Sequence, residues 1–297
     1  MKALMCVPNI SEGKDRIVIE KVVETIRSSP GVILLDYSSD ADHNRSVISY
    51  IGEPGAVVKA TQSLVKTTID LIDMSKQKGS HPRQGAVDVV PFIPISGIAE
   101  KESVEIAHDL GRFVGQLGVP VYFYEDAARH PDRKSLVKVR KGEYEALAEK
   151  ILKPEWKPDE GPAQFIPKTG SIQISSRFPL VALNINLATT NLEIAQTIAK
   201  SVRHINGGFR FVRAMGLSLE EEGLTQVSMN LTHYQKTPIP MVMEAVKREA
   251  ARYGVNVVGS ELVGPVPLEA MGQVLRYYLQ AHDFSMDQII EKSWACR

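Results

Sequence analysis

The chain has 297 residues, of which 43% are hydrophobic and 24% are charged, and these proportions are typical of a globular protein rather than a disordered one. Its 35 Lys and Arg residues balance its 35 Asp and Glu residues, which argues against nucleic acid as the main partner, because duplex binding usually leaves a basic excess. The two cysteines, Cys6 and Cys296, offer no disulfide framework, and no apolar run is long enough for a signal peptide or a membrane span, so we expect a cytoplasmic enzyme or binding protein without a membrane partner.

Residues 2–95 predict the order strand, helix, strand, strand, helix, strand. Apolar residues recur at helical spacing in the helix segments, and Pro54 suits the first position of the second helix. The expected strands are 2–7, 32–36, 44–51 and 87–95, and the expected helices are 15–28 and 54–72. This order is the split β-α-β unit of ferredoxin-like folds, in which two helices cover one face of the sheet. A helix at 102–117, a strand at 119–124 and a helix at 143–152 extend the unit.

The composition changes between residues 153 and 179, where five prolines fall close together. Such a segment predicts a linker or an ordered loop, so we place the domain boundary near residue 180. The same element order then returns. The expected strands are 180–187, 209–215, 226–231 and 255–258, and the expected helices are 192–202, 241–253 and 268–281. The chain is therefore expected to contain two copies of one fold.

His81 begins the most unusual local string, His-Pro-Arg-Gln-Gly, between a predicted helix and a predicted strand. Histidine titrates near neutral pH and can both accept and return a proton. Pro82 would stiffen the loop and Gly85 would let backbone approach a ligand. The string therefore suggests a general acid or base on a rigid loop, and the alternative is an exposed loop histidine beside a turn proline.

The loop at residues 40–45 combines two carboxylates, an imidazole and a guanidinium. It could hold a metal ion, contact a ligand carboxylate through Asn44 or Arg45, or form an ordinary solvated loop, and its spacing matches no strong metal motif. Asn9 follows the first strand, at a place where α/β sheets often bind ligands, but it could also merely cap the next helix.

Amide and hydroxyl side chains alternate along two later strands that are otherwise apolar. With a period of two, each set points to one sheet face. The residues are Asn184, Asn186, Gln226, Ser228 and Asn230. Buried amides require hydrogen-bond partners, so this face predicts either the wall of a polar ligand cavity or a solvent-exposed surface. Glu261 is a candidate ligand carboxylate or a surface charge.

A basic stretch stands out in this neutral chain. It comprises Arg129, Arg133, Lys134, Lys138, Arg140 and Lys141. Such runs usually form a solvated face, and the alternative is the attraction of a polyanionic small molecule.

Eight strings of the sequence, in order, resemble the glutamate formiminotransferase family. They are CVPNISEG (6–13), DHNRS (42–46), DMSKQKGSHPRQGAVDVVPFIP (73–94), KGEYEAL (141–147), GPAQFIPKTG (161–170), ALNINL (182–187), QVSMNLT (226–232) and GSELVGPVPLEAM (259–271). Together they span nearly the whole chain.

The resemblance implies an α+β fold of two ferredoxin-like (βαββαβ) subdomains, with mixed β-sheets covered by helices and a ligand tunnel between them. We place these subdomains at 1–179, ending in the Pro/Gly loop 153–179, and at 180–297. The family pattern also implies a homodimer.

The resemblance further implies transfer of a formimino group from N-formimino-L-glutamate to N5 of tetrahydrofolate, the co-substrate, with His81 as general acid and base and with no metal. Candidate substrate-binding residues are Asn9, Arg45, Arg83, Asn184, Asn186, Gln226 and Asn230. The family's folate-contacting segment matches Gly161, Pro162, Ala163, Gln164, Phe165, Ile166, Pro167, Lys168, Thr169 and Gly170. The basic stretch could guide a polyglutamate tail of the folate.

Two other functions remain open from the sequence. One is a glutamate formyltransferase that uses 5-formyltetrahydrofolate at the same site. The other is a folate-binding protein without turnover.

Overall fold

The computed structural model describes residues 2–291, so Cys296 lies outside the described residues. The chain forms two compact units, Met1–Arg177 and Phe178–Arg297, and each combines a β-sheet with α-helices. Among the described residues, no helix has both the length and the apolar character needed to cross a membrane.

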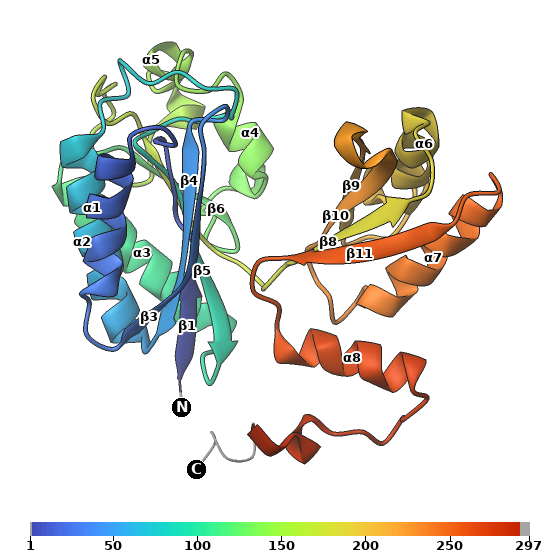
Figure 1. Ribbon diagram of the computed structural model, residues 1–297. Helices are drawn as coiled ribbons and strands as arrows, with labels where there is room; N and C mark the ends of the chain where they lie inside the picture. Colours follow the sequence, from blue (N-terminus) through green and yellow to red (C-terminus); the bar gives the residue numbers. More distant parts are fainter. Residues whose placement is uncertain (1, 292–297) are drawn as a thin grey trace. The chain divides into compact units, whose positions relative to one another are not determined.

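A seven-stranded sheet forms the centre of the first unit (Figure 1). Its strands are β1 (Ala3–Cys6), β2 (Asn9–Ile10), β3 (Val32–Asp40), β4 (Arg45–Gly52), β5 (Val87–Ser96), β6 (Val121–Glu125) and β7 (Ile172–Ser176). Across the sheet, β3 pairs with β4, then β1 and β2 both pair with β4 and β5, and β7 and β6 follow. The pairs β5–β7 and β6–β7 are parallel, whereas the others are antiparallel.

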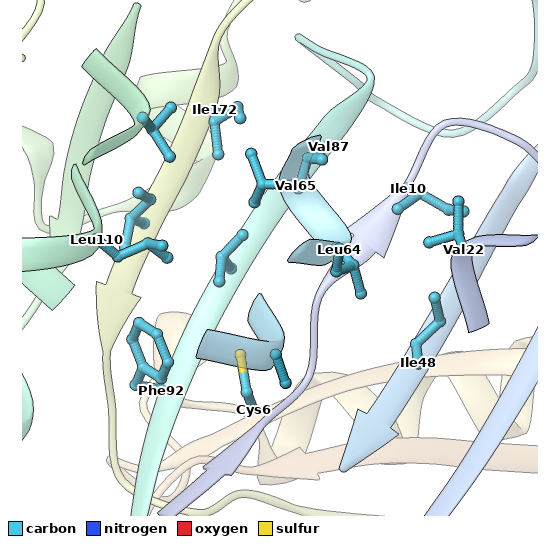
Figure 2. Close-up of a cluster of buried hydrophobic side chains, with 14 of the residues drawn as sticks. Cys6, Ile10, Val22, Ile48, Leu64, Val65, Val87, Phe92, Leu110 and Ile172 are labelled. Carbon is cyan, nitrogen blue, oxygen red and sulfur yellow. The ribbon is translucent and has the colours of Figure 1, made fainter. Parts of the chain in front are cut away.

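Three helices cover one face of this sheet. They are α1 (Arg16–Arg27), α2 (Pro54–Leu71) and α3 (Glu100–Gln116). Asp15 caps α1 by accepting from the backbone N–H groups of Ile17 and Val18, which satisfies two donors of the first turn. Figure 2 shows the resulting core, where Cys6, Ile10 and Ile48 from the strands meet Val22 and Leu64 from the helices. All five side chains are fully buried, so this layer contributes the main hydrophobic stabilisation of the unit.

Two short helices cover part of the opposite face, over β5, β6 and β7. They are α4 (Leu136–Arg140) and α5 (Leu147–Lys150). Val139 and Leu147 pack there with Val89, Tyr122 and Tyr124 in a second apolar cluster. The charged segment around residue 140 therefore packs against the sheet.

The interpretation of residues 153–179 as linker or loop is wrong in part, because Ile172–Ser176 forms the strand β7 between β5 and β6. All five residues of β7 are buried and both of its neighbours are parallel to it, so the strand lacks the alternation of a half-exposed one. Gln173 and Ser175 also interrupt its apolar run. The expected helix at 143–152 is shorter than predicted and is confined to α5.

The second unit is built on a four-stranded antiparallel sheet in the order β11-β8-β10-β9 (Figure 1). Its strands are β8 (Val181–Leu187), β9 (Val212–Leu219), β10 (Leu224–Leu231) and β11 (Val257–Val263). Its helices are α6 (Leu192–Val202), α7 (Ile239–Ala251) and α8 (Leu268–Tyr278). Ile198 of α6 and Val246 of α7 pack on Leu183 and Ile185 of β8. The other sheet face carries the alternating amide side chains.

Candidate active site

Three loops of the first unit converge beside β4 and β5, and two glycines allow them to touch. A Cβ added at Gly13 would lie 2.1 Å from the Asp40 carbonyl oxygen, and one at Gly79 would lie 2.4 Å from that of His43. Asn44 then joins the loops by hydrogen bonds. Its Oδ1 accepts from the Gly13 N–H at 2.9 Å and its Nδ2 donates to the Lys78 carbonyl at 3.0 Å. The loop that carries His81 is thus held against the loop at residues 40–45.

His81 lies between an arginine and a carboxylate, with 16% of its side chain exposed. Its Nδ1 lies 3.5 Å from Arg45 Nη1, and its Nε2 lies 4.0 Å from Asp88 Oδ2. Burial, and secondly the positive charges of Arg45 and Arg140, lower the pKa of His81 to about 4. The imidazole is therefore neutral at pH 7 and can accept a proton.

Asp88 is the buried carboxylate behind His81, and the sequence interpretation missed it. Its side chain is 1% exposed, its Oδ1 accepts from the Gln84 N–H at 2.9 Å, and its Oδ2 pairs with Arg140. Burial raises the pKa of Asp88 to about 6, and Arg140 is the largest influence that opposes this rise. One signal was available, because Asp88 is a lone carboxylate within the valine-rich strand segment Val-Asp-Val-Val.

The two arginines predicted to hold substrate carboxylates have different surroundings. Arg45 is partly buried, its Nε has no hydrogen-bond partner, and burial lowers its pKa. The Nε of Arg83 also has no hydrogen-bond partner, but its guanidinium pairs with Glu145 at 2.9 Å and donates to the Gln77 carbonyl at 3.0 Å. It lines a cavity of about 490 Å³ together with Glu143 and Glu145, whose charges would repel a carboxylate. Arg45 is therefore the better placed of the two to receive an anion.

The polar loop at residues 40–45 satisfies much of its own hydrogen bonding. Asp40 Oδ2 lies 2.8 Å from His43 Nδ1. His43 is half exposed, and its ring centroid lies 6.4 Å from that of His81. Within residues 2–291, no group of three or more His, Cys, Asp or Glu side chains is placed to hold a metal ion.

The segment 161–170 packs against the His81 loop through its backbone. Ala86 N–H donates to the Thr169 carbonyl at 2.9 Å, and Met74 N–H donates to the Lys168 carbonyl at 2.9 Å. Gly170 has a positive φ of 63°, and a Cβ there would lie 2.0 Å from the Gln84 carbonyl oxygen. Asn9 lies on β2, where it pairs with Val47 of β4 and Val89 of β5.

In the second unit, the alternating amides form cross-strand pairs on one face of the sheet. Asn186 is opposite Gln226, whose Nε2 donates to Asn186 Oδ1 at 2.9 Å, and Asn184 is opposite Ser228. Both asparagines donate to Glu261 at 3.5 Å, so that carboxylate belongs to the same polar cluster. Gln226 is 4% exposed, whereas Asn230 is exposed. The face is therefore polar, cross-linked and partly open.

The six residues of the basic stretch have different surroundings. Arg133 and Arg140 are largely buried and pair with Asp159 and Asp88, so they do not belong to a solvated face. Lys138 and Lys141 line a cavity of about 1070 Å³ in the first unit. Lys134 is exposed as well, and Arg129 pairs with Glu160 at 2.9 Å, so the three lysines are the residues of the stretch best placed to attract an anion from solution.

Comparison with known proteins gives matches over most of the chain. The family model described as "Formiminotransferase domain, N-terminal subdomain" matches residues 3–177, and the one described as "Formiminotransferase domain" matches residues 182–293. The chain is 46% identical to a glutamate formimidoyltransferase of Streptococcus pyogenes serotype M1, over 98% of both chains. It is 43% identical to one of Thermoplasma acidophilum, over 98% of this chain and 97% of the relative. It is also 44% identical to a formimidoyltransferase-cyclodeaminase of Gallus gallus, over 94% of this chain and 53% of that longer protein.

Proposed function

The chain belongs to the formiminotransferase domain family, and from that premise we propose that it is a glutamate formimidoyltransferase. It transfers the formimino group of N-formimino-L-glutamate to N5 of tetrahydrofolate, and it releases glutamate and 5-formiminotetrahydrofolate. The observation that carries this function in the geometry is a largely buried His81 whose Nδ1 lies 3.5 Å from Arg45 Nη1.

The reaction needs one proton to move between two nitrogens. N5 attacks the formimino carbon and a carbon–nitrogen bond forms, which leaves N5 with a proton to lose. His81 takes that proton as a base. The bond between the formimino carbon and the glutamate nitrogen then breaks, and His81 returns the proton to the departing nitrogen. Such a shuttle contributes roughly 10²–10⁴ in rate, and holding both substrates in line contributes more.

We assign the glutamate carboxylates to Arg45 rather than Arg83, since Arg83 is already paired with Glu143 and Glu145, whereas Arg45 forms no ion pair within residues 2–291. We assign folate binding in the first unit to the segment 161–170 and to Asn9. In the second unit, the pterin edge, with its several donors and acceptors, matches the amides of Asn184, Asn186, Gln226 and Asn230. A polyglutamate tail on the folate would be attracted by Lys138 and Lys141.

We further propose that both units are ferredoxin-like subdomains, with the boundary near residue 180. The strand order β11-β8-β10-β9, with the element order β-α-β-β-α-β, supports this assignment for the second unit. In the first unit, the order β5, then β1 and β2, then β4 and β3 supports it, with β7 and β6 as an extension. The homodimer remains an expectation from the family, which sedimentation of the purified protein would test.

The first experiment supplies tetrahydrofolate with either N-formimino-L-glutamate or N-formyl-L-glutamate and follows the N5-substituted folate by absorbance. Binding of tetrahydrofolate is measured in parallel. Turnover with the formimino donor alone supports the proposed function. Turnover with only the formyl donor would replace it by a formyltransferase. Binding without turnover from either donor would identify a folate-binding protein.

A further inference from the structure

The proton shuttle through His81 makes no use of the buried Asp88 or of Arg140, its ion-pair partner. We propose that Asp88, held in place by Arg140, is a positioning residue for His81. It accepts the Nε2–H of the imidazole, so that Nδ1, beside Arg45, is the nitrogen that takes and returns the proton. This inference rests on the proposed function, because it specifies how the shuttle is oriented.

The two ring nitrogens of His81 face different partners, and this difference fixes the tautomer. Nδ1 faces Arg45 Nη1 at 3.5 Å, and a guanidinium can only donate hydrogen bonds. A neutral imidazole carries a single N–H, so Nδ1 must be the bare nitrogen and Nε2 must hold the hydrogen. Nε2 is buried without a hydrogen-bond partner, and Asp88 Oδ2 lies 4.0 Å from it.

A separation of 4.0 Å is longer than a hydrogen bond, so the proposal requires the imidazole and the carboxylate to approach each other when substrate binds. Hydrogen bonds between catalytic groups are often long before substrate binds and shorten in the productive complex. Because Nε2 is sealed from solvent on the Asp88 side, Nδ1 is the nitrogen that remains for exchange with a substrate.

The backbone of β5 directs Asp88 toward this position. Asn9 of β2 pairs with Val89 and Ile10 pairs with Val87, so Asp88 is the extra residue of a β-bulge. Bulges re-aim side chains and are frequent beside active sites. The Gln84 N–H holds Oδ1 at 2.9 Å, and Arg140, the last residue of α4, pairs with Oδ2.

The charges around His81 show why a carboxylate is needed there. When the imidazole has taken a proton it becomes a cation, and Arg45, Arg140 and His43 all disfavour that cation. Asp88 supplies the opposing negative charge on the Nε2 side. Because Arg140 binds the same oxygen, it keeps the carboxylate in place while the proton is held on His81.

The test compares Asp88→Asn with a matched control, Asp159→Asn. Asp159 is also 1% exposed, pairs with a buried arginine, Arg133, at 2.8 Å, and accepts from a backbone N–H, but it belongs to another part of the unit. Both variants therefore lose a buried carboxylate that is paired in the same way. With monoglutamyl tetrahydrofolate, we expect Asp88→Asn to lower kcat by roughly 10- to 100-fold, a part of what the shuttle contributes. Asp159→Asn should keep kcat within about twofold, because it leaves that shuttle untouched.

Two further readouts separate positioning from a purely structural role. In Asp88→Asn, the acid limb of kcat/KM should move to lower pH, because the imidazolium loses its negative neighbour. In a protein that already carries His81→Asn, Asp88→Asn should lower kcat little further, because the two residues act as a unit. If Asp88→Asn lowered kcat only as much as Asp159→Asn does, Asp88 would be assigned to folding alone. The same conclusion would follow if its effect on kcat added fully to that of His81→Asn.

The tautomer is measured on the unmodified protein, so the proposal stays testable even if a variant fails to fold. Nitrogen-15 NMR of the His81 imidazole at pH 7 should report a protonated Nε2 and a bare Nδ1. A protonated Nδ1 would overturn the proposal. This readout does not depend on turnover, so it separates failure of the positioning role from failure of the proposed transferase activity.

Discussion

The two units use the same order of strands and helices to build polar regions of different chemistry. The region around His81 in the first unit consists of ionisable side chains that are largely removed from water, and the pKa values of His81 and Asp88 shift in opposite directions. The amide face of the second unit consists of neutral side chains that bond to one another across strands and to Glu261. A proton is best moved by groups whose pKa the fold has adjusted, whereas a polar ligand without net charge is best held by amides.

The difference follows from what covers each sheet. In the first unit, β6 and β7 widen the sheet, and α4 packs over them and delivers Arg140 to Asp88. The buried carboxylate thereby has a charged partner. In the second unit, α6 and α7 pack on one face, and the amide face stays partly open. Amides tolerate that partial exposure, because water can satisfy what the neighbouring strands do not.

Replacement of His81 should have the largest effect on kcat. A smaller effect would contradict the contrast drawn between the His81 region and the amide face. We expect His81→Asn to lower kcat by roughly 10²–10⁴ while the affinity for tetrahydrofolate changes little, because only the proton transfer is lost. His43→Asn is the matched control, since His43 is half exposed and bonded to Asp40. Steady-state kinetics and folate titration measure both quantities. Equal losses in the two variants would remove the special role of His81.

A substitution on the amide face should change the KM for tetrahydrofolate rather than kcat. Asn186→Ala removes the acceptor of Gln226 and a donor to Glu261, so we expect the KM for tetrahydrofolate to rise by about 5- to 30-fold, the equivalent of one or two hydrogen bonds. The kcat should stay within about twofold, because no proton moves there. Asn206→Ala, on an exposed asparagine bonded to Arg203, is the control. A fall in kcat with unchanged KM would show that this face takes part in the chemistry.

The pH dependence of stability should distinguish the two charged residues of the first region. The folded pKa of His81, about 4, lies below its ordinary 6.5, so its contribution is full above pH 6.5 and is lost as pH falls through 4. Relative to His81→Asn, the protein should lose about 2 kcal/mol of unfolding free energy between pH 7 and pH 5. The raised pKa of Asp88 gives the reverse sign, so relative to Asp88→Asn the protein loses stability as pH rises through 6. Urea unfolding at several pH values measures both slopes, and parallel curves for all three proteins would contradict this account.

The smallest effect concerns salt. If Lys138 and Lys141 attract a polyglutamate tail, the KM for polyglutamyl tetrahydrofolate should rise with ionic strength more than the KM for the monoglutamate, because salt screens exposed charges. The difference should be a few-fold between about 50 and 300 mM salt. Replacing both lysines by glutamine should abolish the difference without changing kcat. An equal response of the two substrates would rule out this role for the basic residues.

The sequence predicted those parts of the fold and site that depend on local patterns. The helix expected at 54–72 is found at Pro54–Leu71, and the one expected at 192–202 is found at Leu192–Val202, because each has a regular apolar stripe. The strand β7 escaped prediction, since polar side chains occupy three of its five buried positions. His81 was singled out by its neighbours in the chain. Its partner Asp88 was not, because the pairing with Arg140 joins residues far apart in sequence and depends on a bulge that no local pattern reveals.

The position of β7 within the sheet also bears on how the protein is made. A ribosome releases β5 and β6 well before β7, yet β7 lies between them and pairs with both. Until residue 176 has emerged, β5 has an unpaired edge, β6 has no place in the sheet, and the backbone contact between Gly85 and Gly170 beside His81 cannot form. Exposed strand edges of this kind favour aggregation and the binding of chaperones. The first unit therefore completes its sheet and the loop of His81 late in its synthesis. The second unit has the same requirement on a shorter scale, because β10 follows both β8 and β9 in the chain and lies between them in the sheet.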